Sequence, residues 1–274
     1  MQVPSKNKER YTLADLLRVM ERLRDPKEGC PWDLQQDFHS IVPSTLEECY
    51  ELASAIAQED FPHVQDELGD VLFQVVFYSQ LASEQSLFRF EDVVHSLIEK
   101  LLRRHPHVFA NGEIEGRVDQ TVTVEEVGVS WEAIKAQERS KRSLTGVLAD
   151  VPLALPALSR AQKLQKRAAQ NRFDWQSVDG VLEKLEEEVG ELREALSTGA
   201  EKEISDEMGD VLFTAVNLAR HLKLDAEATL RGASQKFQTR FEIMEGILRE
   251  EGGALNDLDQ QQMDVYWRRA KAQE

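Results

Sequence analysis

Cysteine is scarce in this sequence, and long apolar runs are missing. Two cysteines occur in 274 residues, Cys30 and Cys49, which is too few for a disulfide-stabilised scaffold and favours a cytoplasmic protein. We interpret Cys49, inside an acidic segment, as a small buried side chain. No apolar stretch is long enough for a membrane span, and the polar N-terminus does not resemble a signal peptide.

Positive charge is also in short supply. The chain carries 33 lysines and arginines against 50 aspartates and glutamates, for a formal net charge of −17. A general DNA or RNA binder needs a basic surface for the phosphates, so this balance argues against nucleic acid as a partner. A small phosphate ligand is still compatible with it, because a bound metal ion and a few local cations can dominate one pocket.

Several catalytic motifs are absent. The sequence has no G-x-x-x-x-G-K-[ST] loop, no G-x-S-x-G elbow and no C-x-x-C pair, which excludes P-loop, α/β-hydrolase and zinc-ribbon proteins. The six histidines show no repeated metal-binding spacing. A di-iron bundle would require Glu-x-x-His motifs, whereas each acidic pair here ends in Glu or Asp.

Helical periodicity runs through most of the chain. Apolar residues at positions 13, 16, 17, 20 and 23 lie on one helix face. Further helices are predicted to begin at Ser44-Thr45, to span about residues 64–82 after Pro62, to span 90–104, and to begin near Val124. Modest glycine and proline contents agree with an ordered all-α protein.

The chain also repeats itself. E-E-C-Y-E at 47–51 and D-E-L-G-D-V-L-F at 66–73 return 140 residues later as E-E-V-G-E at 187–191 and D-E-M-G-D-V-L-F at 206–213. A repeat this long indicates duplication of a whole helical module. We predict two tandem helical bundles, residues 1–139 and 157–274, joined by a linker at 140–156.

Each copy places acidic side chains three residues apart on two consecutive helices. Residues at this spacing share a helix face, so two antiparallel helices would bring four carboxylates together. Such a cluster is either solvated surface or a site for Mg²⁺, with Mn²⁺ as a substitute, and its apolar flanks and its repetition favour the metal. Glycine in a helix is costly, so Gly69 and Gly209 indicate a close helix approach beside the ligands. The predicted ligands are Glu48, Glu51, Glu67 and Asp70, and Glu188, Glu191, Glu207 and Asp210.

Basic and aromatic residues follow each acidic pair. Lys100 and Arg104 match Lys236 and Arg240, and Trp131 matches Trp267. Repetition favours phosphate contact for the basic pairs over plain surface charge. The tryptophans are either core residues or stacking surfaces for a nucleobase, and Trp32 and Trp175 carry the same two interpretations.

In combination these motifs resemble a known family. E-E-x-x-E followed by E-x-x-D is similar to the all-α nucleoside triphosphate pyrophosphohydrolases. The tandem layout, with G-C-P-W-D, R-R-H-P-H-V-F-A and F-D-W, resembles bacterial MazG proteins. The resemblance implies a homodimer in which both subunits wall one pocket, and Mg²⁺-dependent hydrolysis of nucleoside triphosphates to monophosphate and pyrophosphate.

The resemblance also assigns roles to residues. Lys184, Lys236 and Arg240 would hold phosphates, Trp267 would lie near the nucleotide, and we expect Glu187 to orient the attacking water. Ser44 stands where the second half has Lys184, which agrees with the second half as the main catalytic half. Two alternatives remain: a narrow dUTP- or dCTP-type pyrophosphohydrolase, and a nucleotide-sensing regulator without turnover.

Overall fold

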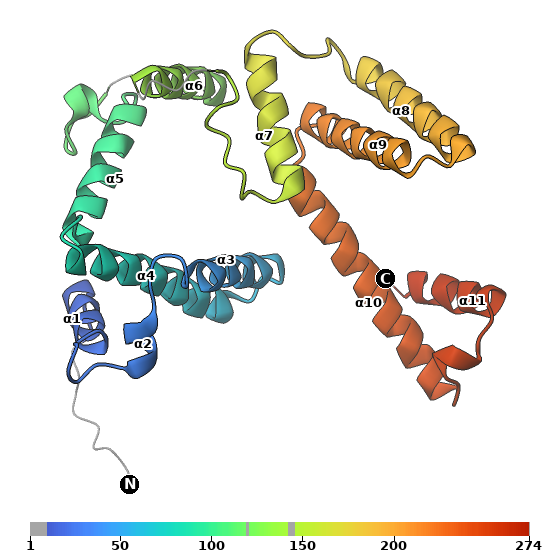
Figure 1. Cartoon of the computed structure of the whole chain (residues 1–274), viewed down its shortest axis with the longest axis horizontal. Coiled ribbons are helices and arrows are strands. Elements are labelled where there is room, and N and C mark those ends of the chain that lie inside the picture. The colour runs from blue at the N-terminus through green and yellow to red at the C-terminus, as the bar shows by residue number, and fades with distance from the viewer. Residues whose placement is uncertain (1–9, 119–120, 142–145, 274) are drawn as a thin grey trace. The chain divides into compact units, whose positions relative to one another are not determined.

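The computed structural model describes residues 10–118, 121–141 and 146–273, which form eleven α-helices and no strand. The all-α prediction is therefore confirmed. The chain divides into two compact units, residues 1–137 and 138–274 (Figure 1). Residues 1–9 of the first predicted module, 142–145 of the predicted linker and Glu274 lie outside the described residues. The linker bounds stay a prediction.

Six helices begin in the first unit: α5 has the predicted bounds, α6 begins at Val124 as predicted, and α1 spans the predicted apolar stripe. α3 and α4 begin earlier than predicted, because Pro43 and Pro62 lie in their first turns, where a missing N–H costs nothing. Asp60 caps α4 by accepting from the His63 backbone N–H at 3.3 Å. The helices are α1 (Leu13–Leu23), α2 (Pro31–Gln35), α3 (Val42–Ala57), α4 (Phe61–Glu84), α5 (Phe90–Arg104) and α6 (Val124–Lys141), with a 3₁₀ turn η1 (Ala110–Gly112).

The core of the first unit lies where α1 and the loop before α3 pack on α4. Its fully enclosed members are Met20, Ile41, Val76, Phe77 and Leu81. Phe77 is 0% exposed. The predicted stripe on α1 is the side that packs here, since Leu16 and Leu17 contact the same cluster. Burial of this stripe stabilises α1, which is only 11 residues long, because isolated helices of that length are marginal in water.

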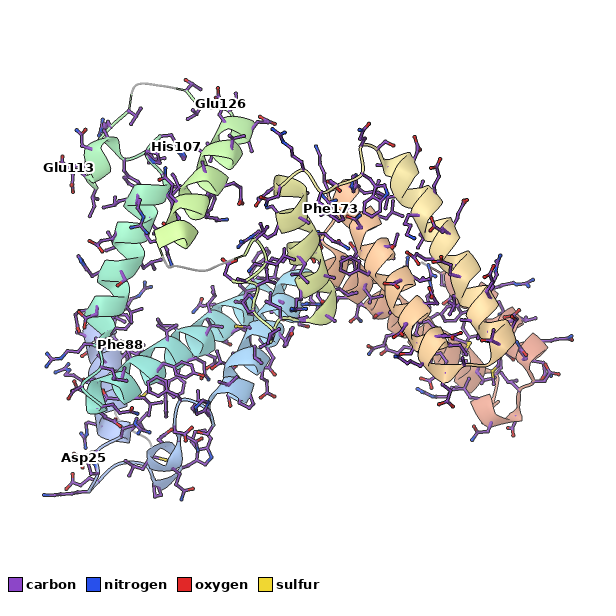
Figure 2. All side chains as sticks on the ribbon, turned by 45° about the horizontal axis from the view of Figure 1, so that its top comes forward. Asp25, Phe88, His107, Glu113, Glu126 and Phe173 are labelled. Atoms are coloured by element: carbon purple, nitrogen blue, oxygen red, sulfur yellow. The ribbon has the colours of Figure 1, made fainter. Side chains whose placement is uncertain are left out.

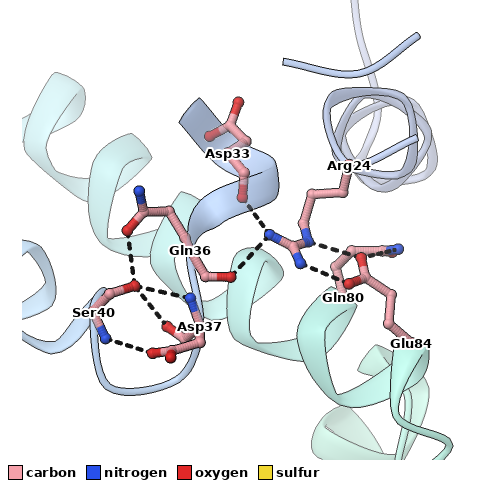
Figure 3. Close-up of polar contacts among 7 residues, drawn as sticks. All are labelled: Arg24, Asp33, Gln36, Asp37, Ser40, Gln80 and Glu84. Atoms are coloured by element: carbon pink, nitrogen blue, oxygen red, sulfur yellow. Dashed lines mark hydrogen bonds and ion pairs between the residues drawn. The ribbon is translucent and has the colours of Figure 1, made fainter. Parts of the chain in front are cut away.

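A buried arginine fixes the segment between α1 and α3 (Figure 3). Arg24 donates from Nε and Nη2 to the two carboxylate oxygens of Glu84 on α4, at 2.8 and 2.7 Å. Its Nη1 donates to the backbone carbonyls of Asp33 and Gln36. The guanidinium also lies over the Phe77 ring, 5.2 Å from its centroid. This two-pronged contact holds α2 against the C-terminal end of α4.

The second unit is built on a helical hairpin. α8 ends at Gly199, whose φ of +74° is a left-handed conformation that glycine adopts without strain, and α9 then returns alongside α8 (Figure 1). α7 packs on α9, whereas α10 continues past the hairpin and packs on α11. The helices are α7 (Ala157–Gln170), α8 (Val178–Thr198), α9 (Glu201–His221), α10 (Ala226–Glu250) and α11 (Gln260–Lys271), with a 3₁₀ turn η2 (Leu255–Asp257).

Two local predictions are wrong. Cys49 is exposed, and its neighbours in sequence, Glu48 and Glu51 among them, are acidic. A Cβ placed on Gly69 or Gly209 would meet no atom within 4 Å, so neither glycine marks a close helix approach in this chain. Among the described helices, none combines the length and apolarity that crossing a bilayer demands.

Candidate active site

The hairpin of the second unit brings three carboxylates together. Glu188 comes from α8, and Glu207 and Asp210 come from α9. One oxygen of each lies within 4.8 Å of one oxygen of the other two. Glu188 is only 6% exposed, Glu207 is half-buried and Asp210 faces solvent. The group therefore has a buried floor and an open side, as a site for a metal-bound ligand requires.

The first unit repeats this arrangement. Glu48 on α3 and Glu67 and Asp70 on α4 meet the same distance criterion. Burial, followed by the charges of Asp70, Glu51, Glu67 and Glu47, raises the pKa of Glu48. Carboxylates that repel one another in this way gain stability when a cation binds between them.

The remaining predicted ligands lie beside these groups. Glu51 and Glu191 are both exposed and do not belong to the sets within 4.8 Å. A side-chain hydrogen bond that protonated Glu191 donates to Glu188, then burial and the charges of Glu188 and Glu207, raises the pKa of Glu191 against the opposing effect of Lys184. Glu191 thus touches the group from its outer edge.

A buried carboxylate oxygen of Glu67 indicates that the acidic group of the first unit can hold a cation. Glu67 is 6% exposed, and its Oε2 atom has no hydrogen-bond partner. Its Oε1 atom lies 2.7 Å from His63 Nε2, one turn earlier on α4. An unpartnered buried carboxylate oxygen in an all-oxygen group suits Mg²⁺ or Mn²⁺. The residues therefore fit such an ion. Sequence reasoning missed His63, although its i, i+4 spacing from Glu67 could have identified the contact.

A lysine distinguishes the second group from the first. Lys184 Nζ lies 2.7 Å from Glu187 Oε1 and 3.0 Å from Glu188 Oε1. Hydrogen bonds to Glu187 and Glu188 raise the pKa of Lys184, so it stays cationic. Ser44 occupies the equivalent position in the first unit, one turn before Glu48. The lysine thus lies at the acidic group, as the family resemblance implies, and Glu187 is exposed beside it.

The second basic pair lies on a different helix pair. Lys236 and Arg240 belong to α10, and Trp267 belongs to α11. The Trp267 ring lies 5.3 Å from the ring of Phe237, the neighbour of Lys236. Because α10 leaves the hairpin after α9, this cluster and the acidic group lie on separate parts of the unit (Figure 1). One chain alone does not bring them together.

The first unit again shows the equivalent cluster. Lys100 and Arg104 lie at the end of α5. The ring of Trp131 lies 5.3 Å from that of His105, and Lys135 Nζ lies 4.9 Å from the Trp131 centroid. Trp131 Nε1 is buried without a hydrogen-bond partner. Trp131 and Trp267 are both half-buried, so neither is a fully enclosed core residue.

Comparisons with known proteins identify the family of the chain. The model of the MazG nucleotide pyrophosphohydrolase domain matches twice, at residues 36–109 and 176–243. A nucleoside triphosphate pyrophosphohydrolase of Escherichia coli K12 is 46% identical over 263 residues, which cover 94% of this chain and 97% of that protein. The nucleoside triphosphate pyrophosphohydrolase/pyrophosphatase MazG of Thermotoga maritima is 44% identical over 257 residues, covering 94% of each chain.

A solved structure also aligns with part of the chain. The crystal structure of a mazG-related protein from Thermotoga maritima aligns with a TM-score of 0.38 and 23% identity, covering 45% of this chain and 99% of that one. The doubled domain match and the nearly full-length identity to two named relatives decide the family. The chain belongs to the MazG nucleotide pyrophosphohydrolase family.

Proposed function

We propose that this chain hydrolyses nucleoside and deoxynucleoside triphosphates to the monophosphate and pyrophosphate, as a housekeeping enzyme of the nucleotide pool. The observation that carries the proposal is the convergence of Glu188, Glu207 and Asp210 within 4.8 Å, with Lys184 Nζ 3.0 Å from Glu188. Carboxylates that gather a divalent cation, beside a lysine that can hold phosphate, form the usual arrangement for a metal-bridged polyphosphate.

The cofactor in this proposal is Mg²⁺, with Mn²⁺ as a substitute. Glu188, Glu207 and Asp210 would hold it, and Glu191 lies close enough at the rim to complete the set. When bound, the ion supplies neutralisation of phosphate charge and a lowered pKa for a coordinated water. The oxygen-only donors favour these hard ions over Zn²⁺.

The chain's own residues then divide the remaining work. Lys184 places a positive charge against the phosphates, and it must give up part of its contact with Glu187 to do so. The released Glu187 carboxylate is exposed, so it can accept a hydrogen bond from the attacking water and orient it. Glu187 and Lys184 therefore act as a pair that exchanges partners when substrate arrives.

A homodimer completes the proposal. Lys236, Arg240 and Trp267 contact nucleotide only if the acidic group and the α10–α11 cluster come together, and a second copy of the chain supplies the missing half. Support comes from apolar side chains that α9 and α10 leave exposed, because such a face marks an interaction surface. Those at least 44% exposed are Met208, Leu212, Phe213, Leu230 and Phe237. Light scattering on the purified protein measures the oligomeric state.

Lys100, Arg104 and Trp131 would serve a nucleotide in the first unit in the same way. The cytoplasm is the proposed compartment, and neither nucleic acid nor membrane is a proposed partner.

The decisive experiment measures products. Purified full-length protein is incubated with Mg²⁺ and a panel of ribo- and deoxyribonucleoside triphosphates, and pyrophosphate and monophosphate are quantified. We expect equal amounts of both products, and no product with excess chelator. Release of orthophosphate alone by folded protein would show that a different bond is cleaved. Turnover confined to dUTP or dCTP would support the narrow alternative, and nucleotide binding without turnover would support the sensor.

A further inference from the structure

The second unit contains an apolar cavity of about 290 Å³, and none of the three carboxylates of the acidic group lines it. It lies between α7, the loop that leads into α8, and the second half of α9. Its apolar lining includes Leu164, Phe213 and Trp175. Phe173 precedes Trp175 in the same loop and also lines the cavity, although it is 77% exposed (Figure 2). The cavity is large enough for one small planar molecule.

One wall of the cavity carries an acceptor without a partner. Gln165 on α7 is 7% exposed, and its Nε2 donates to the backbone carbonyl of Phe213 at 2.7 Å. That carbonyl can only accept, so the amide cannot be flipped and Oε1 must face the other way. Oε1 is buried and has no hydrogen-bond partner. A buried acceptor in this state costs free energy until a donor reaches it.

The charges around the cavity are already paired. Arg220 donates from Nη2 to Asp174 Oδ1 and from Nε to Asn217 Oδ1 at 2.9 Å. His221 Nε2 also lies 3.0 Å from Asp174 Oδ1. The arginine that lines the cavity, Arg220, therefore already has partners and does not favour a phosphate there. The apolar walls also disfavour a charged ligand. The complementary ligand is neutral and flat and carries an N–H donor.

The cavity and the acidic group share α9, and the loop that lines the cavity leads directly into α8, which carries Glu188. Phe213 lies one turn beyond Asp210 on α9. The indole of Trp175 packs against Gly180, where an added Cβ would come within 3.1 Å of Trp175 Cδ1. Gly180 precedes Glu188 by eight residues of α8, or about 12 Å at 1.5 Å per residue, and Lys184 lies between them. A nucleotide with its phosphates at the acidic group can point its base toward this cavity.

We propose that this cavity binds the nucleobase of the substrate and that Gln165 Oε1 accepts a hydrogen bond from an N–H of the base. The proposal rests on the proposed function, because it places the two parts of one nucleotide. Gln165 lies outside both segments matched by the family model. In the first unit the position equivalent to Asn217 holds Phe77, which is 0% exposed and belongs to the packed core. The base site therefore belongs to the second unit alone.

The test crosses two substrates with two enzymes. ATP is compared with purine riboside triphosphate, whose base carries no N–H, in the wild-type protein and in Gln165→Met. We expect kcat/KM of the wild type to be about fivefold lower for purine riboside triphosphate, the usual effect of one lost neutral hydrogen bond, and this difference to vanish in Gln165→Met. No difference in the wild type, or an undiminished difference in Gln165→Met, would overturn the proposal.

The matched control is Gln162→Met on the same helix. Both amide atoms of Gln162 are engaged, with Leu224 O at 2.7 Å and Ala226 N at 2.9 Å, and the residue does not line the cavity. It must keep the wild-type substrate difference. A second variant, Asn217→Phe, introduces the first unit's residue and fills the cavity. We expect KM for ATP to rise at least about tenfold with a much smaller change in kcat, and an unchanged KM in folded protein contradicts the proposal.

Binding separates this proposal from the proposed function. Calorimetry with AMP and purine riboside monophosphate needs no turnover, and the same fivefold preference for AMP is expected. If no nucleotide yields pyrophosphate, the proposed function fails. The binding preference for AMP over purine riboside monophosphate still tests whether the cavity binds the base. If pyrophosphate is released but the preference is absent, only the base site fails.

Discussion

The two units carry the same acidic motif in different surroundings. In the first unit, Glu67 is held by His63 and keeps a buried oxygen without a partner. In the second unit, Lys184 bridges Glu187 and Glu188. Asn217 lines the cavity of the second unit. At the equivalent position the first unit has Phe77, which is enclosed in the core. The duplicated ligand geometry is thus compatible with metal in both units, whereas the groups suited to hold a nucleotide are concentrated in the second.

The largest effect is expected in the packed core of the first unit. Phe77→Asn replaces an enclosed ring with a smaller polar group, and it removes the surface under the Arg24 guanidinium. We expect the free energy of unfolding to fall by about 3–5 kcal/mol, measured by denaturant titration of the full chain. Phe61→Asn is the matched surface control, since Phe61 is exposed. Equal losses for both variants would show that the first unit is not organised around Phe77.

The acidic groups can be compared through equivalent substitutions. Glu188→Ala removes the most buried ligand of the second unit, and we expect pyrophosphate release to fall on the order of 100-fold or more. Glu48→Ala makes the same change in the first unit, where Ser44 supplies no cation, and most activity should remain. Product assays under saturating Mg²⁺ measure both. A larger loss from Glu48→Ala would reverse the assignment of the main catalytic half.

The lysine that distinguishes the two groups can be removed or transferred. Lys184→Met deletes a cation next to the phosphates, and we expect kcat/KM to fall on the order of tenfold. Ser44→Lys places a lysine one turn before Glu48 and reproduces the second unit's arrangement. Burial and then repulsion raise the pKa of Glu48; because the new cation offsets the repulsion, that pKa should fall. Titration followed by NMR measures this change, and an unaltered Glu48 pKa would contradict the assumed contact.

The smallest expected effect is a pH dependence of metal-free stability. Burial and then repulsion raise the folded-state pKa of Glu48, and a hydrogen bond with Glu188, then burial and repulsion, raises that of Glu191, so the folded state binds more protons. The stability of metal-free protein should therefore fall as pH rises through this range toward neutrality. Mg²⁺ removes the repulsion, so it should raise Tm by a few degrees more at pH 7.5 than at pH 5. NaCl at matched ionic strength is the control, and an equal Mg²⁺ shift at both pH values would contradict this account.

Much of the fold could be predicted because its signals are local. The apolar stripe over 13–23 and the helix over 90–104 follow from side-chain spacing alone, and both match the structure. Helix starts were less predictable. Pro62 is predicted to separate two helices and Ser44-Thr45 to begin one, yet Pro43 and Pro62 both lie inside a first turn, where proline is tolerated.

The site shows where such reasoning stops. Residues three apart on a helix differ by about 60° in direction, so sequence could place Glu188 and Glu191 on one side but could not decide which faces α9. The structure buries Glu188 and leaves Glu191 at the edge. Gln165 could not be found from sequence because its partner, Phe213, is set by packing, whereas the His63 contact with Glu67 follows from i, i+4 spacing. Glu67 and Gln165 each have a side-chain oxygen that is buried without a hydrogen-bond partner. This property can be recognised only from the three-dimensional structure.

By itself the sequence determined the all-helical class, the duplication and the acidic pairs, since helix periodicity and repeated spacing are properties of the chain read in order. The tertiary structure decided which carboxylates converge, which cation accompanies them and which core position opens into a cavity. Those outcomes depend on how one helix is rotated against its neighbour, and that rotation is fixed by contacts between residues far apart in the sequence.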